Sequence, residues 1–121
     1  MKFTRENSSA TTIRRVSGSA IVVGNERFTT TIALTPEGLV ESFMPPPLEE
    51  LVIAHFEPLL EWEPELLILG TGERNVFPPR ELTFAFARRR IGFEVMDTAA
   101  AARTFNVLAG EGRRLAAVLY L

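Results

Sequence analysis

The chain has 121 residues, 46% of them hydrophobic and 23% charged, with a formal net charge of −2 at pH 7. This size and balance are typical of one globular domain. The absence of Cys rules out disulfides, Cys-ligated zinc, iron–sulfur clusters and thiol nucleophiles. His55 is the only histidine, which also rules out a His-rich metal site. We therefore expect neither a metal nor another cofactor.

The first residues, Met1–Asn7, contain no apolar segment of signal-peptide length. No run elsewhere approaches the roughly 18 apolar residues of a membrane-spanning helix. The sequence therefore predicts a cytoplasmic protein that does not insert into a membrane.

Charge is distributed unevenly along the chain. Residues 1–27 contain five basic and two acidic side chains, residues 28–73 contain nine Glu and no Lys or Arg, and residues 74–121 contain eight Arg and four acids. These segments could attract one another within one fold, or they could form a bipolar surface that binds a partner. The basic residues are scattered and not interleaved with exposed aromatics, so we expect no binding to nucleic acid.

The first third of the chain predicts β structure. The runs Ala20–Val23 and Glu26–Leu34 are rich in β-branched residues. Gly24-Asn25 between them predicts a two-residue hairpin loop, because both residues can take positive φ. A turn at Pro36–Gly38 and a further short strand over Leu39–Phe43 complete this region.

A Pro-rich segment follows. Pro45–Pro47 predicts extended backbone, since each proline denies its predecessor the α region. Leu48–Leu60 predicts one or two short helical pieces, with Pro58 in the first turn of the second piece. We interpret His55 in this segment as a structural residue rather than a catalytic base.

The second half predicts alternating strands and helices. Glu65–Gly70 and Gly92–Met96 have the apolar character of buried strands, and Leu115–Leu121 is the last strand. Asp97 is a suitable N-cap for a helix over Thr98–Ala109, which ends at the glycines that follow it, Gly110 and Gly112.

The segment Pro79–Arg90 predicts a helix with Pro in its first turn. Leu82, Phe84 and Phe86 also alternate with period two, which leaves a strand open. Arg88–Arg90 would place cations at the negative end of the helix dipole. Phe84 lies off the apolar face of the helix, and we expect it either to pack against a loop or to contact a partner.

One glycine-containing loop is a candidate binding site. Gly70-Thr71-Gly72 follows a buried strand, and Glu94 stands where a ribose-binding acid would lie in a dinucleotide-binding protein. The dinucleotide motif needs a third Gly where Asn75 stands, and a helix that begins directly after the loop. Here Val76–Pro79 separates the loop from the next predicted helix. The alternatives are a tight turn that needs glycine, or a small ligand or anion site.

Arg103 and Asn106 are three residues apart on one side of the last predicted helix. They could lie on an exposed surface with Arg103 near Glu94 or Asp97, or line a pocket beneath Gly70–Gly72. No Ser stands in a nucleophile elbow, and no two acids have the spacing of a paired catalytic site.

Two stretches, Pro64–Gly72 and Glu94–Leu108, together resemble a small domain family of unknown function from archaea, bacteria and eukaryotes. That family includes the mitochondrial complex I assembly factor 3 and the adipogenesis-associated domain protein, and the chain is most similar to its proteobacterial branch. The resemblance implies a three-layer α/β fold with a central mixed sheet, an N-terminal antiparallel β layer and helices packed on the other face. It also implies that the family's Gly-Thr-Gly loop and helical Arg and Asn correspond to Gly70, Thr71, Gly72, Arg103 and Asn106, with no activity attached to them.

We interpret residues 1–121 as a single domain, mainly β over 1–43, Pro-rich with short helices over 44–62, and β-α-β-α-β over 63–121. The sequence favours a non-enzymatic interaction or assembly module that binds another protein and is itself a monomer or weak homo-oligomer. The alternative is a small-molecule or anion binder, with weak enzymatic activity as a further option. It would use Gly70–Gly72 together with Arg103 and Asn106.

Overall fold

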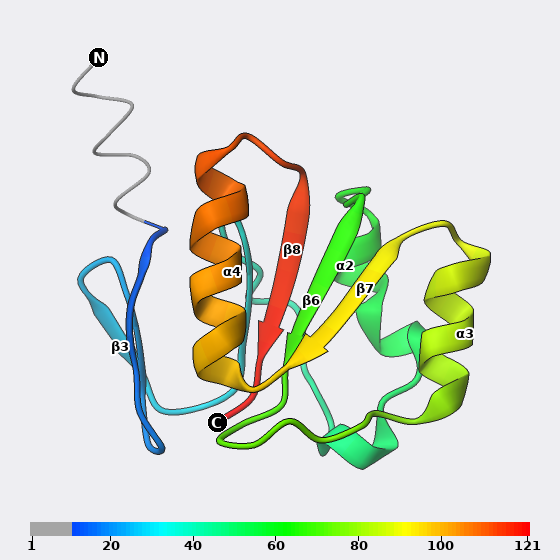
Figure 1. The fold of residues 1–121 in the computed structure, drawn as a ribbon, viewed down its shortest axis with the longest axis horizontal. Helices are drawn as coiled ribbons and strands as arrows, with labels where there is room; N and C mark the ends of the chain where they lie inside the picture. Colours follow the sequence, from blue (N-terminus) through cyan, green and yellow to red (C-terminus); the bar gives the residue numbers. More distant parts are fainter. Residues whose placement is uncertain (1–10) are drawn as a thin grey trace.

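The computed structural model describes residues 11–121, which form two β-sheets and a set of helices (Figure 1). The expectations for Met1–Asn7 concern residues outside this described part. The smaller sheet is antiparallel with the order β1-β2-β3, and the larger has five strands in the order β5-β4-β8-β6-β7. Within the larger sheet β5, β4 and β8 are antiparallel neighbours, whereas β8, β6 and β7 run parallel. The expected central mixed sheet and separate antiparallel layer are therefore confirmed.

The smaller sheet consists of three short strands, β1 (Ile13–Val16), β2 (Ile21–Val23) and β3 (Glu26–Phe28). The expected hairpin is present, because Val23 pairs with Glu26 across Gly24 and Asn25. Gly24 has φ 59°, whereas Asn25 is not among the residues with positive φ. This is the pattern of a type II′ turn, in which only the first central residue needs the glycine.

The expected strand over Glu26–Leu34 serves both sheets. It is interrupted after β3, and its second part becomes β4 (Ile32–Thr35) in the larger sheet. The expected strand over Leu39–Phe43 is wrong, since β5 covers only Gly38–Leu39. The chain instead turns so that the Phe43 N–H donates to the carbonyl of Val40, and the buried Phe43 ring joins the core.

Three short helical pieces follow Pro45–Pro47, namely η1 (Leu48–Glu50), η2 (Ile53–Phe56) and α2 (Glu57–Leu60). Pro58 lies in the first turn of α2, as expected. The His55 ring accepts a hydrogen bond at Nδ1 from the Val52 N–H at 3.0 Å, which places it in the local turn structure of η2.

The last part of the chain alternates strands and helices, in the order β6 (Leu66–Gly70), α3 (Arg80–Arg88), β7 (Gly92–Met96), α4 (Thr98–Gly110) and β8 (Leu115–Leu119). The helix over α3 is thus confirmed against the alternative of a strand. Asp97 caps α4 as expected, because its side chain accepts from the Ala100 N–H at 2.8 Å. Gly112, with φ 78°, ends α4 in a Schellman arrangement: its N–H donates to Ala109, and the Arg113 N–H donates to Leu108.

The two crossover helices cover opposite faces of the larger sheet. β7 and β8 lie on opposite sides of β6, so right-handed crossovers send α3 and α4 to different faces. One core unites α4 with β1 and β2, through buried side chains that include Ile13, Ile21, Ile68 and Phe105. The other core unites η2, α2 and α3, through Phe56, Leu59, Leu82 and Phe86. The helices η2, α2 and α3 therefore cover the face of the larger sheet opposite the smaller sheet. α4 instead packs on the same face as the smaller sheet.

Candidate functional site

The Gly70-Thr71-Gly72 loop lies at the carboxyl end of β6, where the fold changes direction. The loop after β6 leads to α3 on one face of the sheet, and the loop after β7 leads to α4 on the other (Figure 1). Open α/β sheets commonly bind ligands in the crevice at such a point. The loop predicted from the sequence as a candidate site therefore lies where this architecture favours ligand binding.

The polar groups of this loop are bonded to the chain itself. The Gly72 N–H donates to Thr98 Oγ1 at 2.8 Å, and the Thr98 N–H donates back to the Gly72 carbonyl at 2.8 Å. The Thr71 N–H donates to the Met96 carbonyl at 2.9 Å. The Thr98 hydroxyl also donates to the Tyr120 carbonyl at 2.6 Å. Because these N–H groups already have partners, the loop differs from a phosphate-binding loop, whose amides point at the ligand.

Packing explains why glycine stands at both ends of the motif. A Cβ at Gly70 would lie 2.9 Å from the Thr98 Cα and 3.1 Å from the Ala101 Cβ, closer than side chains pack. Gly72 has φ 106°, a conformation that residues with a Cβ rarely adopt. Both observations support the interpretation of the motif as a tight turn that lets α4 approach β6.

Asn106 is bound to the N-terminal sheet rather than to the loop. Its Nδ2 donates to the Ile13 carbonyl at 2.8 Å, and its Oδ1 accepts from the Ile13 N–H at 3.0 Å. This pair of bonds continues the hydrogen bonding of β1 onto α4 and joins residues 93 positions apart in the sequence. The Asn106 side chain therefore has a structural use that the sequence did not reveal.

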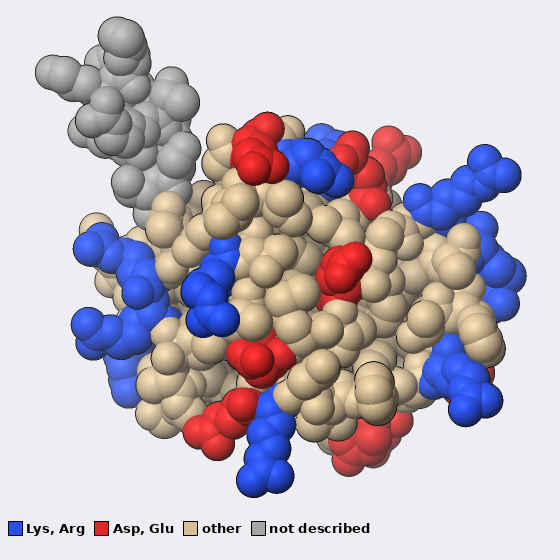
Figure 2. Space-filling view, in the orientation of Figure 1, with Lys and Arg blue, Asp and Glu red and all other residues tan. Residues whose placement is uncertain are grey.

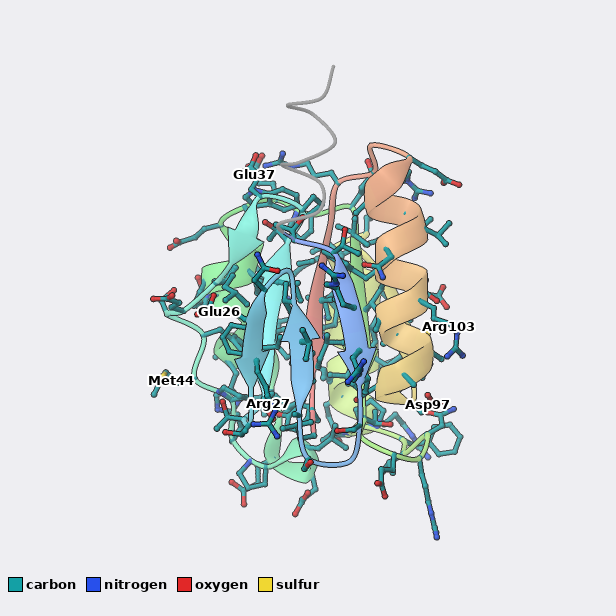
Figure 3. All side chains as sticks on the ribbon, turned by 90° about the vertical axis from the view of Figure 1, so that its left-hand side faces the viewer. Glu26, Arg27, Glu37, Met44, Asp97 and Arg103 are labelled. Carbon is teal, nitrogen blue, oxygen red and sulfur yellow. The ribbon has the colours of Figure 1, made fainter. Side chains whose placement is uncertain are left out.

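Arg103 points outward from α4 (Figure 3). It forms no ion pair with Glu94 or Asp97, the two acids considered for it. The hollow beside Gly72, about 340 Å³, is lined by Asp97 and Thr98 among others, but not by Arg103 or Asn106. The structure thus brings Gly72 and the start of α4 together and leaves Arg103 and Asn106 outside that group.

The second half of the same loop is exposed. The Thr71 hydroxyl donates to the Arg74 carbonyl at 2.5 Å and accepts from the Val76 N–H at 3.0 Å, which folds the loop back on itself. Val76 and Phe77 then project into solvent, with 46% and 89% of their surface exposed. We missed Phe77 in the sequence because it belongs to no periodic pattern. The signal available was an aromatic residue next to two prolines, where neither strand nor helix could bury it.

The α3 helix adds a second exposed aromatic side chain. Leu82, Ala85 and Phe86 are buried, whereas Phe84 is 52% exposed on the outer side of the helix. Of the two options for Phe84, the structure therefore shows the exposed one. The interaction between helix and strand on the inner side includes Phe86 and Phe93, whose rings stack with centroids 4.5 Å apart.

A groove of about 630 Å³ lies between α3, the preceding loop and β7. We call it the α3–β7 groove; it is lined by Phe77, Pro78, Arg80, Thr83, Phe93 and Val95. Figure 2 shows Arg side chains gathered over α3, at the right of the view. Four exposed arginines belong to this region, namely Arg80 and Arg88–Arg90, and none of them forms an ion pair with another described residue. The groove therefore combines an apolar wall with positive charge.

A separate hollow of about 730 Å³ lies under the Pro-rich segment. Tyr120 forms part of its wall, and its hydroxyl donates to the Pro46 carbonyl at 2.7 Å. Burial, with a smaller contribution from nearby Glu49, raises the pKa of Tyr120 to about 12. The phenol therefore stays protonated and fastens the end of β8 to the Pro-rich segment.

Within residues 11–121 there is no group of three or more His, Asp or Glu side chains arranged to hold a metal ion. The same part of the chain contains no helix of the length and apolar character needed to cross a membrane.

Residues 13–120 match the model of a family described as "Protein of unknown function (DUF498/DUF598)". The chain belongs to this family. A protein of Xanthomonas campestris with a known solution structure is 41% identical and superposes with a TM-score of 0.82, covering 89% of this chain and 82% of its own. The family resemblance and the α/β architecture inferred from the sequence are thus confirmed.

Curated relatives extend the comparison to named proteins. The NADH dehydrogenase [ubiquinone] 1 alpha subcomplex assembly factor 3 of Bos taurus is 32% identical over 95% of this chain and 63% of its own length. A "13 kDa major membrane protein" of Francisella tularensis is 26% identical over 60% of this chain and 58% of its own length. The matched parts cover between 33% and 65% of the curated relatives, so their functions are not transferred whole to this chain.

Proposed function

We propose that the chain is a non-enzymatic interaction or assembly module that binds another protein through α3, the loop before it and β7, a surface that we call the α3 side. The observation that carries this proposal is the exposure of two large aromatic side chains, Phe77 at 89% in the wall of the apolar groove and Phe84 at 52% on the outer side of α3. Aromatic residues and arginines, which this part of the surface combines, are enriched in protein interfaces. The assembly factors among the relatives support the same class of function.

The rest of the site supports binding rather than catalysis. The polar groups of the Gly70–Gly72 loop are engaged in holding the turn, and Thr71 orders the residues that precede Phe77. A rigid loop presents an aromatic side chain at low entropic cost, because little further ordering is needed on binding. The Gly-Thr-Gly motif thus contributes to function by positioning the apolar surface.

Affinity capture from native lysate tests the proposal. We expect the tagged chain to recover one or more proteins reproducibly, and the double variant Phe77→Ser/Phe84→Ser to lose them. Val107→Ser is the matched control, because Val107 is an apolar residue with 59% exposure on α4, on the opposite face of the sheet. Equal capture by all three proteins, or no partner with any of them, would contradict the proposal.

Two further features belong to the same proposal. We expect a monomer or weak homo-oligomer, which sedimentation at several protein concentrations would measure. We also propose a cytoplasmic location in a bacterial cell, which fractionation of the native host would test. Recovery of the chain in the membrane fraction would contradict that location.

The alternative is a small-molecule or anion site at Gly70–Gly72 with Arg103 and Asn106. The hydrogen bonds of Gly72 and Asn106 argue against it, because a ligand would have to replace bonds already made within the chain. Amide-shift mapping with millimolar phosphate and nucleotides distinguishes the two functions. Shifts confined to this loop would favour the alternative.

A further inference from the structure

The larger sheet has one open edge of full length. Among residues 11–121, β7 is the last strand in the order β5-β4-β8-β6-β7, and it pairs only with β6. The opposite edge is β5, which covers two residues, Gly38–Leu39. Natural proteins usually protect a sheet edge by shortening it, charging it or covering it. Within β7 only Glu94 is charged, so this edge has little protection of its own.

The backbone groups that face outward from β7 can be assigned. The Gly92 N–H donates to the Glu65 carbonyl at 2.9 Å, and the Met96 carbonyl accepts from the Thr71 N–H at 2.9 Å, so the even-numbered residues face β6. Backbone direction alternates along a strand, which turns the N–H and C=O groups of Phe93 and Val95 away from β6. No described residue bonds to these four groups.

The side chains of the same two residues line the α3–β7 groove. A strand added beside β7 would lie about 4.8 Å from it and would direct every second side chain toward α3. Those side chains would contact the apolar wall formed by Phe77, Phe93 and Val95. Edge and groove are therefore arranged to bind one extended segment by its backbone and by alternate side chains at once.

We propose that β7 accepts an extended segment of a partner protein as an added β-strand, with alternating apolar residues and at least one Asp or Glu. The acidic residue follows from charge complementarity, since Arg80 lines the groove and Arg88–Arg90 stand at the C-terminal end of the same helix, all without ion-pair partners among the described residues. This inference rests on the proposed function, because it states how the partner binds to the α3 side.

Selection from a phage-displayed library of random linear peptides against the full chain tests the proposal. We expect enriched peptides with apolar residues at alternate positions and Asp or Glu among them. Binding should weaken about tenfold for Val95→Pro, which removes one outward N–H and leaves the bonds to β6 in place. Arg80→Glu should also weaken binding, whereas Arg103→Glu on α4 should not.

A second series leaves the protein unchanged, so it decides even if Val95→Pro fails to fold. Synthetic versions of an enriched peptide carry one N-methyl group at successive positions. We expect methylation to weaken binding at every second position only, because alternate N–H groups face β7. No enriched peptide, apolar residues at helical spacing, or equal tolerance of methylation at all positions would overturn the proposal.

Two outcomes distinguish failure of the added-strand proposal from failure of the proposed function. If lysate capture depends on Phe77 and Phe84 but Val95→Pro captures equally well, the added strand is overturned and the proposed function stands. If the free chain dimerises and Val95→Pro abolishes the dimer, β7 pairs with a second copy, which also overturns the proposal.

Discussion

The two crossover helices of this domain are used differently. α4 packs on the larger sheet beside β1, with Asp97 as its cap, Gly112 at its end and Asn106 bonded to β1. α3 packs through one face only, begins without a side-chain cap, and is followed by Arg90 with φ 59°. The α4 side satisfies its polar groups within the chain, whereas the α3 side leaves aromatic, cationic and backbone groups available. The difference indicates that α4 maintains the fold and that α3 serves binding.

The largest expected effect on stability concerns Thr98, the first residue of α4, whose hydroxyl bonds to both Gly72 and Tyr120. Thr98→Val keeps the shape but leaves the Gly72 N–H and the Tyr120 carbonyl without their partner. We expect a loss of about 3 kcal/mol in the free energy of unfolding, because each buried unsatisfied group costs roughly 1–3 kcal/mol. Urea denaturation measures it.

The control for this prediction is Thr104→Val on the same helix. The Thr104 hydroxyl has only a weak contact with the Met96 sulfur at 3.5 Å, so a change below about 0.5 kcal/mol is expected. Equal losses of stability for the two variants would contradict the assigned role of the Thr98 hydroxyl, which is to bond the Gly72 N–H and the Tyr120 carbonyl.

Asn106→Ala should have the next largest effect. The Ile13 N–H and carbonyl would both lose a partner, and we expect a loss of about 2 kcal/mol, reduced by the better helix propensity of Ala. The exposed Arg103→Ala should change stability by less than about 0.5 kcal/mol. Chemical denaturation of both variants checks this, and similar values for the two would contradict the different roles assigned to them.

Arg90→Gly tests the end of α3. The Arg90 N–H donates to Ala87 and the Ile91 N–H to Phe86, which is the arrangement that Gly112 supports in α4. An L-residue in the left-handed region costs about 1 kcal/mol, so the variant should be more stable by about that amount. Thermal unfolding measures the change. Arg89→Gly, one residue earlier at φ −88°, should not stabilise.

Tyr120 gives the smallest expected effect. Its folded pKa of about 12 exceeds the ordinary value of 10.0, so its contribution to stability is complete below pH 10 and is lost as the pH rises toward 12. The free energy of unfolding should fall over that interval, and Tyr120→Phe should remove that part of the fall. Because the chain has a single Tyr, tyrosinate absorbance reports its titration directly. A midpoint near 10 in the folded protein would contradict the assignment.

Local signals in the sequence predicted much of the fold. Gly24-Asn25 fixed a hairpin, Asp97 fixed the start of α4, and the apolar run before Gly70 indicated a strand covered on both faces. Strand order and the shared face of α4 depend on contacts between distant segments, and periodicity carries no information about those. The mixed sheet came from the family resemblance alone.

The candidate site was predicted in part. The Gly70–Gly72 loop does lie at the switch point of the sheet, but its hydrogen bonds to Thr98 are invisible in the sequence. Asn106 was considered for an exposed surface or for a pocket beneath the loop, and nothing in the sequence indicates its actual partner, the Ile13 backbone. Phe77 and the open edge of β7 were missed, because the exposure of a loop residue and the outermost position of a strand are set by the assembled sheet.

The central claim is that partners bind on the α3 side. Amide hydrogen exchange of the chain, free and bound to its captured partner, tests this claim most directly. The account predicts slower exchange in the segment from Val76 through β7, including the Phe93 and Val95 amides, with no change on the outer face of α4 around Arg103 and Val107. Protection around Arg103 and Val107 with none in β7 would contradict it.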